Sequence, residues 1–479
     1  MCKSSILKPS MKILLFFFMG FLFASGSLLS QDKITINHAD SLVGSSVDGK
    51  PVREAIGNVS LTHNNVKITC NHVIQYLDEN KADLSGNVRV VQDTVTITAP
   101  NGTYYGNESK VICPNGAVLT DPNNTLKANY GIYYFTQDLA EFRGNVRITD
   151  SKSYTLTSDE LKYYHNVNKS YADGNVKVVT DSSTIYSDHM VYEKLIGIST
   201  ATDNVKIESD STIITSNKLV HYDFEKKSIA DGNVKIDFTN KNAVVYGNHA
   251  ENYEKLSYSF VQGNSRLIQI DDKNGKQDTV FINSDKMESF RKKPEHYIAH
   301  DSVKIIRTDF YSNSQVAYYF RDSTGSGGVI TLSIDPVVWK DDLQVTGDSI
   351  YANFKQDLED IYINKAAFAI QPNPDFDGRF DQVSGVFMYM KFLDNQLDYI
   401  RVDTNAASIY FVYDNKSPNG ANKSNGEVII LNLKEKQVEK VKIIGLPKGT
   451  YYPENLVNPS ALRLLGFRIR TNKPQRENR

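Results

Sequence analysis

The stretch Ala230-Asp231-Gly232-Asn233-Val234-Lys235-Ile236 decides how this chain folds, because versions of it return at a nearly constant spacing. Its Gly-Asn-Val core, or a worn copy, begins at positions 57, 86, 116, 144, 174, 203, 232 and 263. The steps are therefore 29, 30, 28, 30, 29, 29 and 31 residues. A fixed period of this size is typical of a repeat architecture.

Each copy predicts a turn followed by a strand. Gly-Asn between two alternating runs indicates a two-residue hairpin turn, because both residues tolerate positive φ. Apolar residues then alternate with a cation, as in Val234-Lys235-Ile236. Alternation places the apolar pair on one face of a strand and the cation on the other. We expect an interior-facing apolar set made of Val88, Val90, Val146, Ile148, Val176, Val178, Val205, Ile207, Val234 and Ile236.

A second mark follows most copies. It is a small residue, then Asn or Asp, then an aromatic residue, as in Ser187-Asp188 with Tyr192. Polar turns such as Asn166–Lys169 then lead back to the next Gly-Asn. Each unit therefore predicts a long strand, a polar turn and a shorter return strand. The fold class is all-β: repeated antiparallel strands stacked as an elongated, twisted, jellyroll-like array.

Composition narrows the function classes. Of 479 residues, 40% are hydrophobic, which is enough for a core and argues against global disorder. The chain has 28 Tyr against 1 Trp, and Thr, Val and Ile recur, which favours strands. Its net charge of −2 provides no overall field for nucleic acid, so no nucleic-acid partner is expected.

The first 30 residues resemble a targeting segment. Lys3, Lys8 and Lys12 precede the apolar run Ile13–Phe23, and Ala24-Ser25-Gly26 offers a small-residue cleavage site. This pattern predicts a secretory signal peptide and therefore export from the cytoplasm. A retained N-terminal membrane anchor is the alternative.

Two cysteines lie beyond this segment. Cys70 and Cys113 could pair in an oxidising compartment, and buried free thiols are the alternative.

The chain divides into four expected regions. The signal peptide covers 1–30, the repeat array 31–370, a smaller β-rich C-terminal region 371–444 and a basic tail 445–479. Pro372 and Pro374 mark the boundary after the array. In the tail, Leu456–Leu465 predicts one short helix, and the cations indicate either a solvated tail or a partner-binding patch.

No catalytic constellation stands out. The cysteines lack zinc spacing, and there is no phosphate loop and no Gly-x-Ser-x-Gly elbow. His72, His189 and His249 occupy one repeat position, but other copies hold Tyr, Glu or Lys there, which indicates a solvent-facing slot. We expect a protein that is not an enzyme and that has no cofactor and no metal.

The repeated Gly-Asn-Val with its small-Asn/Asp…Tyr mark resembles the OstA/LptA family of lipopolysaccharide-transport proteins, roughly over Ala55–Ile370. The C-terminal stretches Asp403–Tyr410 and Gly445–Pro453 look like the long OstA-like proteins of the Bacteroidetes type. The resemblance implies a β-jellyroll, open along one seam, whose apolar interior holds the acyl chains of lipid A, and units that join end to end across the periplasm. Lipopolysaccharide and other β-jellyroll transport components are the implied partners.

Two interpretations of the apolar stripe stay open. The ten interior residues could line a lipid groove, or they could fill the dry core of a closed β-solenoid-like scaffold or adhesin. A transport groove must leave apolar side chains without protein partners along one seam.

The ends of the array form the other expected interaction site. Terminal strands of a stacked array carry unpaired N–H and C=O groups, which are either blocked or used for strand addition. Pro372 and Pro374 would block the far end near Ile370. We therefore expect the N-terminal edge to join a partner jellyroll or a second copy.

Overall fold

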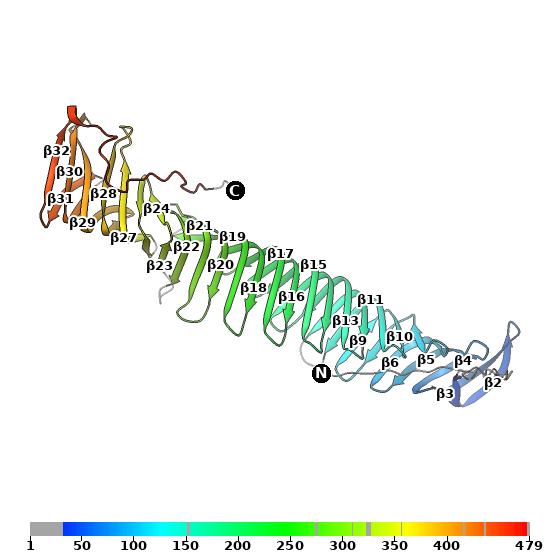
Figure 1. The fold of residues 1–479 in the computed structure, drawn as a ribbon. Helices are drawn as coiled ribbons and strands as arrows, with labels where there is room; N and C mark the ends of the chain where they lie inside the picture. Colours follow the sequence, from blue (N-terminus) through cyan, green and yellow to red (C-terminus); the bar gives the residue numbers. More distant parts are fainter. Residues whose placement is uncertain are drawn as a thin grey trace, which may run out of the picture.

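The computed structural model describes residues 32–150, 154–273, 276–308, 310–321, 327–355, 357–414, 417–434 and 437–476. These residues form one antiparallel sheet of thirty-two strands and a three-residue 3-10 helix, Glu454–Leu456 (η1). The sheet is an elongated, twisted array with β2 and β3 at one end and β32 at the other (Figure 1). The all-β jellyroll prediction is confirmed, and the predicted signal peptide lies outside the described residues.

The strands follow one another along the array in nearly sequential order. The first third contains β1 (Thr35–His38), β2 (Ser41–Val47), β3 (Lys50–His63), β4 (Val66–Tyr76), β5 (Lys81–Gln92), β6 (Val95–Tyr105), β7 (Lys110–Cys113), β8 (Ala117–Thr120), β9 (Asn124–Ala128), β10 (Tyr130–Tyr134), β11 (Leu139–Asp150), β12 (Thr155–Tyr164) and β13 (Lys169–Val179).

The middle of the array contains β14 (Ser183–Glu193), β15 (Ile198–Ser209), β16 (Thr212–Tyr222), β17 (Lys227–Phe238), β18 (Ala243–Tyr253), β19 (Tyr258–Lys273), β20 (Lys276–Phe290), β21 (His296–Ile306) and β22 (Tyr311–Arg321). The last part contains β23 (Gly328–Ser333), β24 (Val337–Lys340), β25 (Leu343–Thr346), β26 (Ser349–Phe354), β27 (Leu358–Pro372), β28 (Phe380–Leu393), β29 (Gln396–Asp414), β30 (Ser417–Lys434), β31 (Gln437–Ile444) and β32 (Lys448–Pro453).

The Gly-Asn pairs are not hairpin turns, so that part of the sequence prediction is wrong. They lie in the middle of long strands, where the register slips by one residue, as between Asp231 and Val234 of β17. Gly232 and Asn233 both have positive φ, 75° and 49°. A repeated β-bulge of this kind bends each strand at its centre. The hairpin turns are instead the polar segments, such as residues 223–226.

The two sequence marks meet at these bulges. The Asn or Asp of the second mark lies against the Gly-Asn of the following strand, as Asn175 Nδ2 shows by donating to Asp159 Oδ2 at 2.7 Å. A Cβ on Gly232 would lie 2.7 Å from Asn217 Nδ2, so only glycine fits there. We call this line of bulges the spine, and it explains why both marks share one period.

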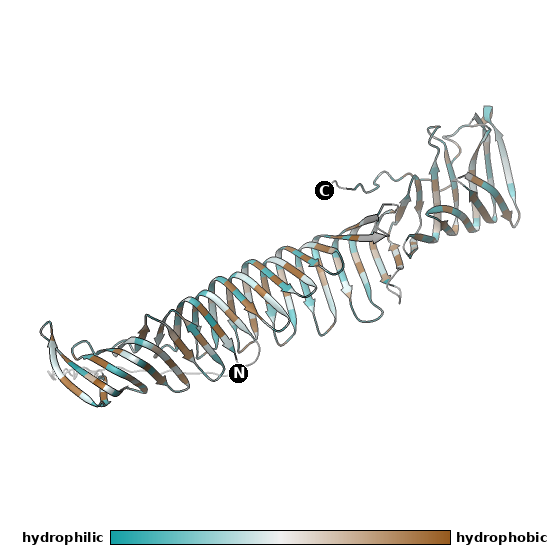
Figure 2. Cartoon of the chain, turned by 180° about the vertical axis from the view of Figure 1, so that it is seen from behind, coloured by the Kyte–Doolittle hydropathy of each residue, from teal (hydrophilic) through white to brown (hydrophobic). Residues whose placement is uncertain are grey.

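The spine divides the sheet into two walls. The first wall is the half of each strand next to the turns at 165–168, 194–197, 223–226 and 254–257, and the second wall is the other half. Buried residues alternate on both halves, and most of the buried apolar residues of β3 to β19 belong to one hydrophobic core. The two inner faces therefore face each other, and apolar bands recur in strand after strand (Figure 2).

The C-terminal part differs from expectation in three ways. The sheet does not end near Ile370, because β27 pairs with β25, β26 and β28. The helix predicted for Leu456–Leu465 is wrong, since only Glu454–Leu456 is helical there. The described tail is not simply solvated, because Leu462 and Leu464 are buried in a separate small core with Phe368 and Phe411. The predicted division into regions at 370 and 444 stays a prediction.

Candidate functional site

The inner face of the second wall carries an unbroken row of aliphatic side chains. Each member is the cross-strand partner of the next, from β3 to β21. The row consists of Leu61, Ile68, Val90, Ile97, Leu119, Leu126, Ile148, Leu156, Val178, Ile185, Ile207, Ile214, Ile236, Val245, Leu267, Ile282 and Ile305.

Solvent exposure of this aliphatic row changes along the array. From Leu61 to Val178 every member is buried. From Ile185 to Ile282 the members are half-buried, with Val245 as the exception at 8% exposure, and Ile305 is buried again. We call β3–β13 the closed section and β14–β20 the open section. The six strand spacings of the open section, at about 4.8 Å each, make about 29 Å.

The facing residues on the first wall account for the difference. In the closed section the cross-strand row Tyr104, Val111, Tyr133, Ala140 and Tyr163 supplies three buried rings. The same row continues through Ser170 of β13 and Tyr192 of β14. The remaining strands of the open section then carry six half-buried residues that we call the polar row: Ser199, His221, Ser228, Asn252, Ser259 and Ser289. These shorter polar side chains leave the aliphatic row opposite them uncovered.

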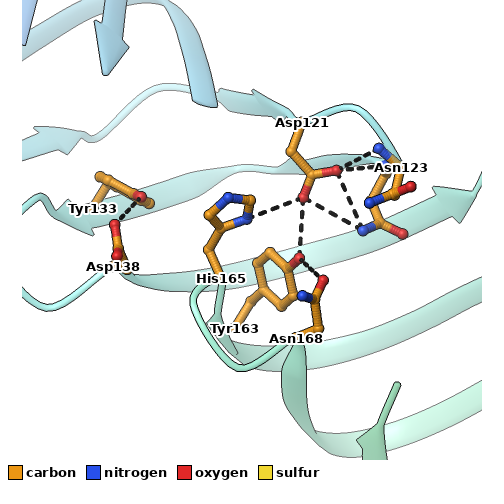
Figure 3. Close-up of polar contacts among 8 residues, drawn as sticks. Asp121, Asn123, Tyr133, Asp138, Tyr163, His165 and Asn168 are labelled. Atoms are coloured by element: carbon orange, nitrogen blue, oxygen red, sulfur yellow. Dashed lines mark hydrogen bonds and ion pairs between the residues drawn. The ribbon is translucent and has the colours of Figure 1, made fainter. Parts of the chain in front are cut away.

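Polar contacts between the walls hold the closed section shut. His63, at the end of the second wall, forms a 2.9 Å hydrogen bond with the Tyr104 hydroxyl. Further along, the Tyr163 hydroxyl donates to Asp121 at 3.0 Å, and His165 lies 3.5 Å from the same carboxylate (Figure 3). Asp121 also accepts the backbone N–H of Asn123 at 2.7 Å. This arrangement joins the rims of the two walls.

Side chains nearly fill the space between the two walls where the closed and open sections meet. Tyr154 of the second wall meets Tyr192 of the first, with ring centroids 6.4 Å apart. The cavity beside them, which Tyr163 and Lys194 also line, has a volume of about 20 Å³. That volume is enough for about one water molecule and too small for a hydrocarbon chain.

Beyond the open section the walls meet again. Phe310, at the second-wall rim, packs edge-on against Phe354 of the first wall at 5.3 Å, and the Arg307 guanidinium lies 4.7 Å from the same ring. The Lys340 ammonium donates to Asn395 Oδ1 at 2.8 Å across the same gap. The open section is therefore bounded by wall-to-wall contacts on both sides.

The ten residues predicted to face the interior do so, but they are not equally accessible. Val88, Val90, Val146, Ile148, Val176, Val178, Val205 and Val234 are buried. Ile207 and Ile236 are half-buried members of the open section. Whether any of them contacts lipid stays a prediction.

Sequence reasoning missed Ile185, Ile214, Leu267 and Ile282, which belong to return strands or to worn copies. The signal that could have found them is cross-strand pairing, since each is opposite a residue of a neighbouring strand in the same row. The change from Tyr to Ser and His at the row facing them was also visible in the sequence.

Other candidate chemistry lies outside the inner face. His72, His189 and His249 are on the outer face, each beside a carboxylate of a neighbouring strand, such as Asp231 for His249 at 2.5 Å. No cluster of three or more potential metal ligands occurs in the described part of the chain. The two cysteines are free and buried, and burial raises the pKa of Cys70 to about 11 and of Cys113 to about 12.

The comparisons with known proteins agree with this architecture. Residues 31–188 match a family model described as OstA-like protein. No match to a curated protein was found. Among the described residues, none of the helices could cross a bilayer. Residues 31–188 are therefore similar to OstA-like proteins, in agreement with the family that the repeat resembles.

Proposed function

We propose that this protein binds and transports lipid in the periplasm, shielding the acyl chains of lipopolysaccharide against the aliphatic row. The observation that carries the proposal is the half-buried state of that row between Ile185 and Ile282, facing short polar side chains. Each methylene that an acyl chain buries there contributes about 0.8 kcal/mol. The same row in the closed section is already covered by protein side chains and offers no such gain.

The bridging role between inner and outer membranes is supported by the N-terminal edge. β1 and β2 both pair with β3, and all of β2 is exposed. Leu42 and Val43 of β2 are 57% and 50% exposed. An exposed edge strand with apolar side chains is suited to strand addition by another β-jellyroll or a second copy.

A closed scaffold without lipid cargo is the second candidate. The wall-to-wall contacts of the closed section and those around Phe310 and Phe354 favour it. The two candidate functions differ in whether lipid covers the aliphatic row of the open section.

A crosslinking experiment with neighbouring positions tests the proposal. Ile214 and Ile213 are adjacent in β16 and both half-buried, but Ile214 belongs to the aliphatic row and Ile213 faces outward opposite Asp237. A photo-crosslinking amino acid at Ile214 should capture lipopolysaccharide in cells, whereas the same group at Ile213 should not. Equal capture from both positions, or none from Ile214, would leave the closed scaffold as the better account.

A further inference from the structure

One backbone position recurs at the rim of the first wall. It is the residue after each return strand, whose N–H donates to a carbonyl of the preceding turn, as Phe135 does to Ser109 at 2.8 Å. We call it the rim position. From β6 onward its successive occupants are Gly106, Phe135, His165, Lys194, Asp223, Glu254 and Arg291.

Rim side chains reach toward the interior. In the closed section Phe135 is buried against Tyr133, at a ring-centroid distance of 4.8 Å, and His165 approaches Asp121. Over the open section the apolar and aromatic occupants give way to four charged ones, two cations and two carboxylates. Asp223 lies 3.2 Å from His221 of the polar row. The rim thus closes one section and places charges over the other.

Arg291 is the rim residue best suited to hold a ligand. Its guanidinium donates to Ser259 Oγ at 2.8 Å and to Asn252 Oδ1 at 2.9 Å, and both acceptors belong to the polar row. These bonds fix the orientation of the side chain and use two of its five N–H donors. A fixed, always charged, planar donor set is suited to a phosphate or a carboxylate.

We propose that the open section holds an amphiphile in one orientation, with its hydrocarbon against the aliphatic row and an anionic head group on Arg291. This inference rests on the proposed function. The two walls of the open section differ in chemistry, aliphatic on the second and polar on the first, so a bound amphiphile can satisfy both only when it lies across them. Contacts between the walls at both boundaries imply entry from the side, through the rim.

Three amphiphilic probes separate the contribution of the head group to binding from that of the hydrocarbon chain. Dodecyl phosphate and dodecyl maltoside carry the same hydrocarbon chain, and that of dodecanoate is shorter by one methylene. Each is added to the full chain below its micelle concentration, with calorimetric titration as the readout. Arg291→Gln should weaken binding of dodecyl phosphate by about tenfold or more, because a charge-assisted bidentate contact is lost. Binding of dodecyl maltoside should change by less than about twofold. The dodecanoate arm shows whether a carboxylate can replace the phosphate.

Matched variants make the outcomes distinct. Lys292→Gln removes the adjacent cation and should leave binding of all three probes unchanged, whereas Arg291→Lys should restore part of the dodecyl phosphate affinity. Ile214→Asp should weaken all three. If the wild-type chain binds none of the probes, the proposed function itself fails. If it binds them but Arg291→Gln weakens the phosphate and the maltoside equally, or neither, the orientation proposal is overturned while the lipid site stands.

Discussion

At the residue scale, the fold depends on the glycine of each Gly-Asn pair. Because glycine has no Cβ, it can adopt the positive φ at which the strand bends. Gly232 has a φ of 75°, and any Cβ would meet Asn217 of the neighbouring strand. Replacement by alanine at positive φ costs about 1–2 kcal/mol, and the clash adds to this. We expect Gly232→Ala to lower the thermal unfolding midpoint measurably.

Gly44 is the matched control for that substitution. It lies in β2, and a Cβ there would have nothing within 4 Å. Gly44→Ala should therefore leave the unfolding midpoint unchanged or raise it slightly. Equal losses from the two substitutions in differential scanning calorimetry would contradict the role assigned to the spine.

Asp381 of β28 makes the stability of the C-terminal section, β23–β32, depend on pH. Burial raises the pKa of its carboxyl to about 6, although Oδ1 accepts the backbone N–H of Phe411 at 3.0 Å. The folded chain therefore keeps this proton to higher pH than the unfolded chain, and stability falls as pH rises between about 4 and 6. Asp381→Asn keeps the acceptor without the charge, so it should raise stability at pH 7 by about 1–2 kcal/mol. This free energy is smaller than the full pKa shift would give, because solvent screens the charge of a half-buried carboxylate.

The measurement compares chemical unfolding midpoints at pH 3.5 and pH 7 for wild type and Asp381→Asn. The substitution should help at pH 7 and have little effect at pH 3.5, where the wild-type carboxyl is already protonated. A benefit of the same size at both pH values would show that its origin is not the buried charge.

At the scale of the strand, the hairpin of β2 and β3 shows which edge amides are available. Its turn, Asp48-Gly49, has two residues and positive φ at both, so the closing pair Val47 and Lys50 is hydrogen-bonded. Pairs alternate from there, which leaves the N–H of Leu42 pointing to the free edge. Leu42→Pro removes that donor without breaking the bonds between β2 and β3.

We expect Leu42→Pro to abolish edge pairing with a partner jellyroll or a second copy. Leu42→Ala keeps the N–H and removes the apolar side chain, so it should weaken association less. Sedimentation velocity as a function of concentration distinguishes the two variants. A wild-type chain that stays monomeric at high concentration, with every jellyroll partner offered, would remove the support for strand addition.

At the scale of the strand, some features could be predicted from the sequence and others could not. The period, the alternation and the inward phase of residues such as Val146 and Val176 were readable, because they are local properties of one strand. The Gly-Asn pair was misassigned because a bulge and a hairpin turn both require positive φ, and only cross-strand register separates them. The open section was not predicted, because its exposure depends on which side chains face one another across the two walls.

At the scale of the whole molecule, the array is closed, then open, then closed. Rings such as Tyr104 and Tyr163 fill the first part, and Phe310 and Phe354 meet beyond the open part. One repeat can thus make a rigid support or an accessible face by exchanging a few inner residues, with no change of backbone. A conduit that passed lipid lengthwise would require the wall-to-wall contacts to open.

The C-terminal tail crosses many of the last strands on their outer face and runs back toward the middle of the array (Figure 1). Two glutamines hold it by mimicking backbone groups. Gln382 donates to Leu462 O and accepts Leu464 N–H, and Gln344 does the same with Arg468 O and Arg470 N–H. Arg470 also pairs with Asp335.

We therefore expect the tail to be a structural part of the C-terminal section and to have no role in binding lipid. Ending the chain after residue 458 removes the buried side chains of Leu462 and Leu464, each worth about 1.5–3 kcal/mol on burial. Thermal unfolding of this variant should begin at a lower temperature, because the apolar side chains of Phe368 and Phe411 lose their cover. Affinity for dodecyl maltoside should match that of the full chain, since the tail reaches the open section at Thr279 O of β20, outside the aliphatic row. A truncated chain with unchanged unfolding but lost probe binding would reverse this assignment and make the tail part of the site.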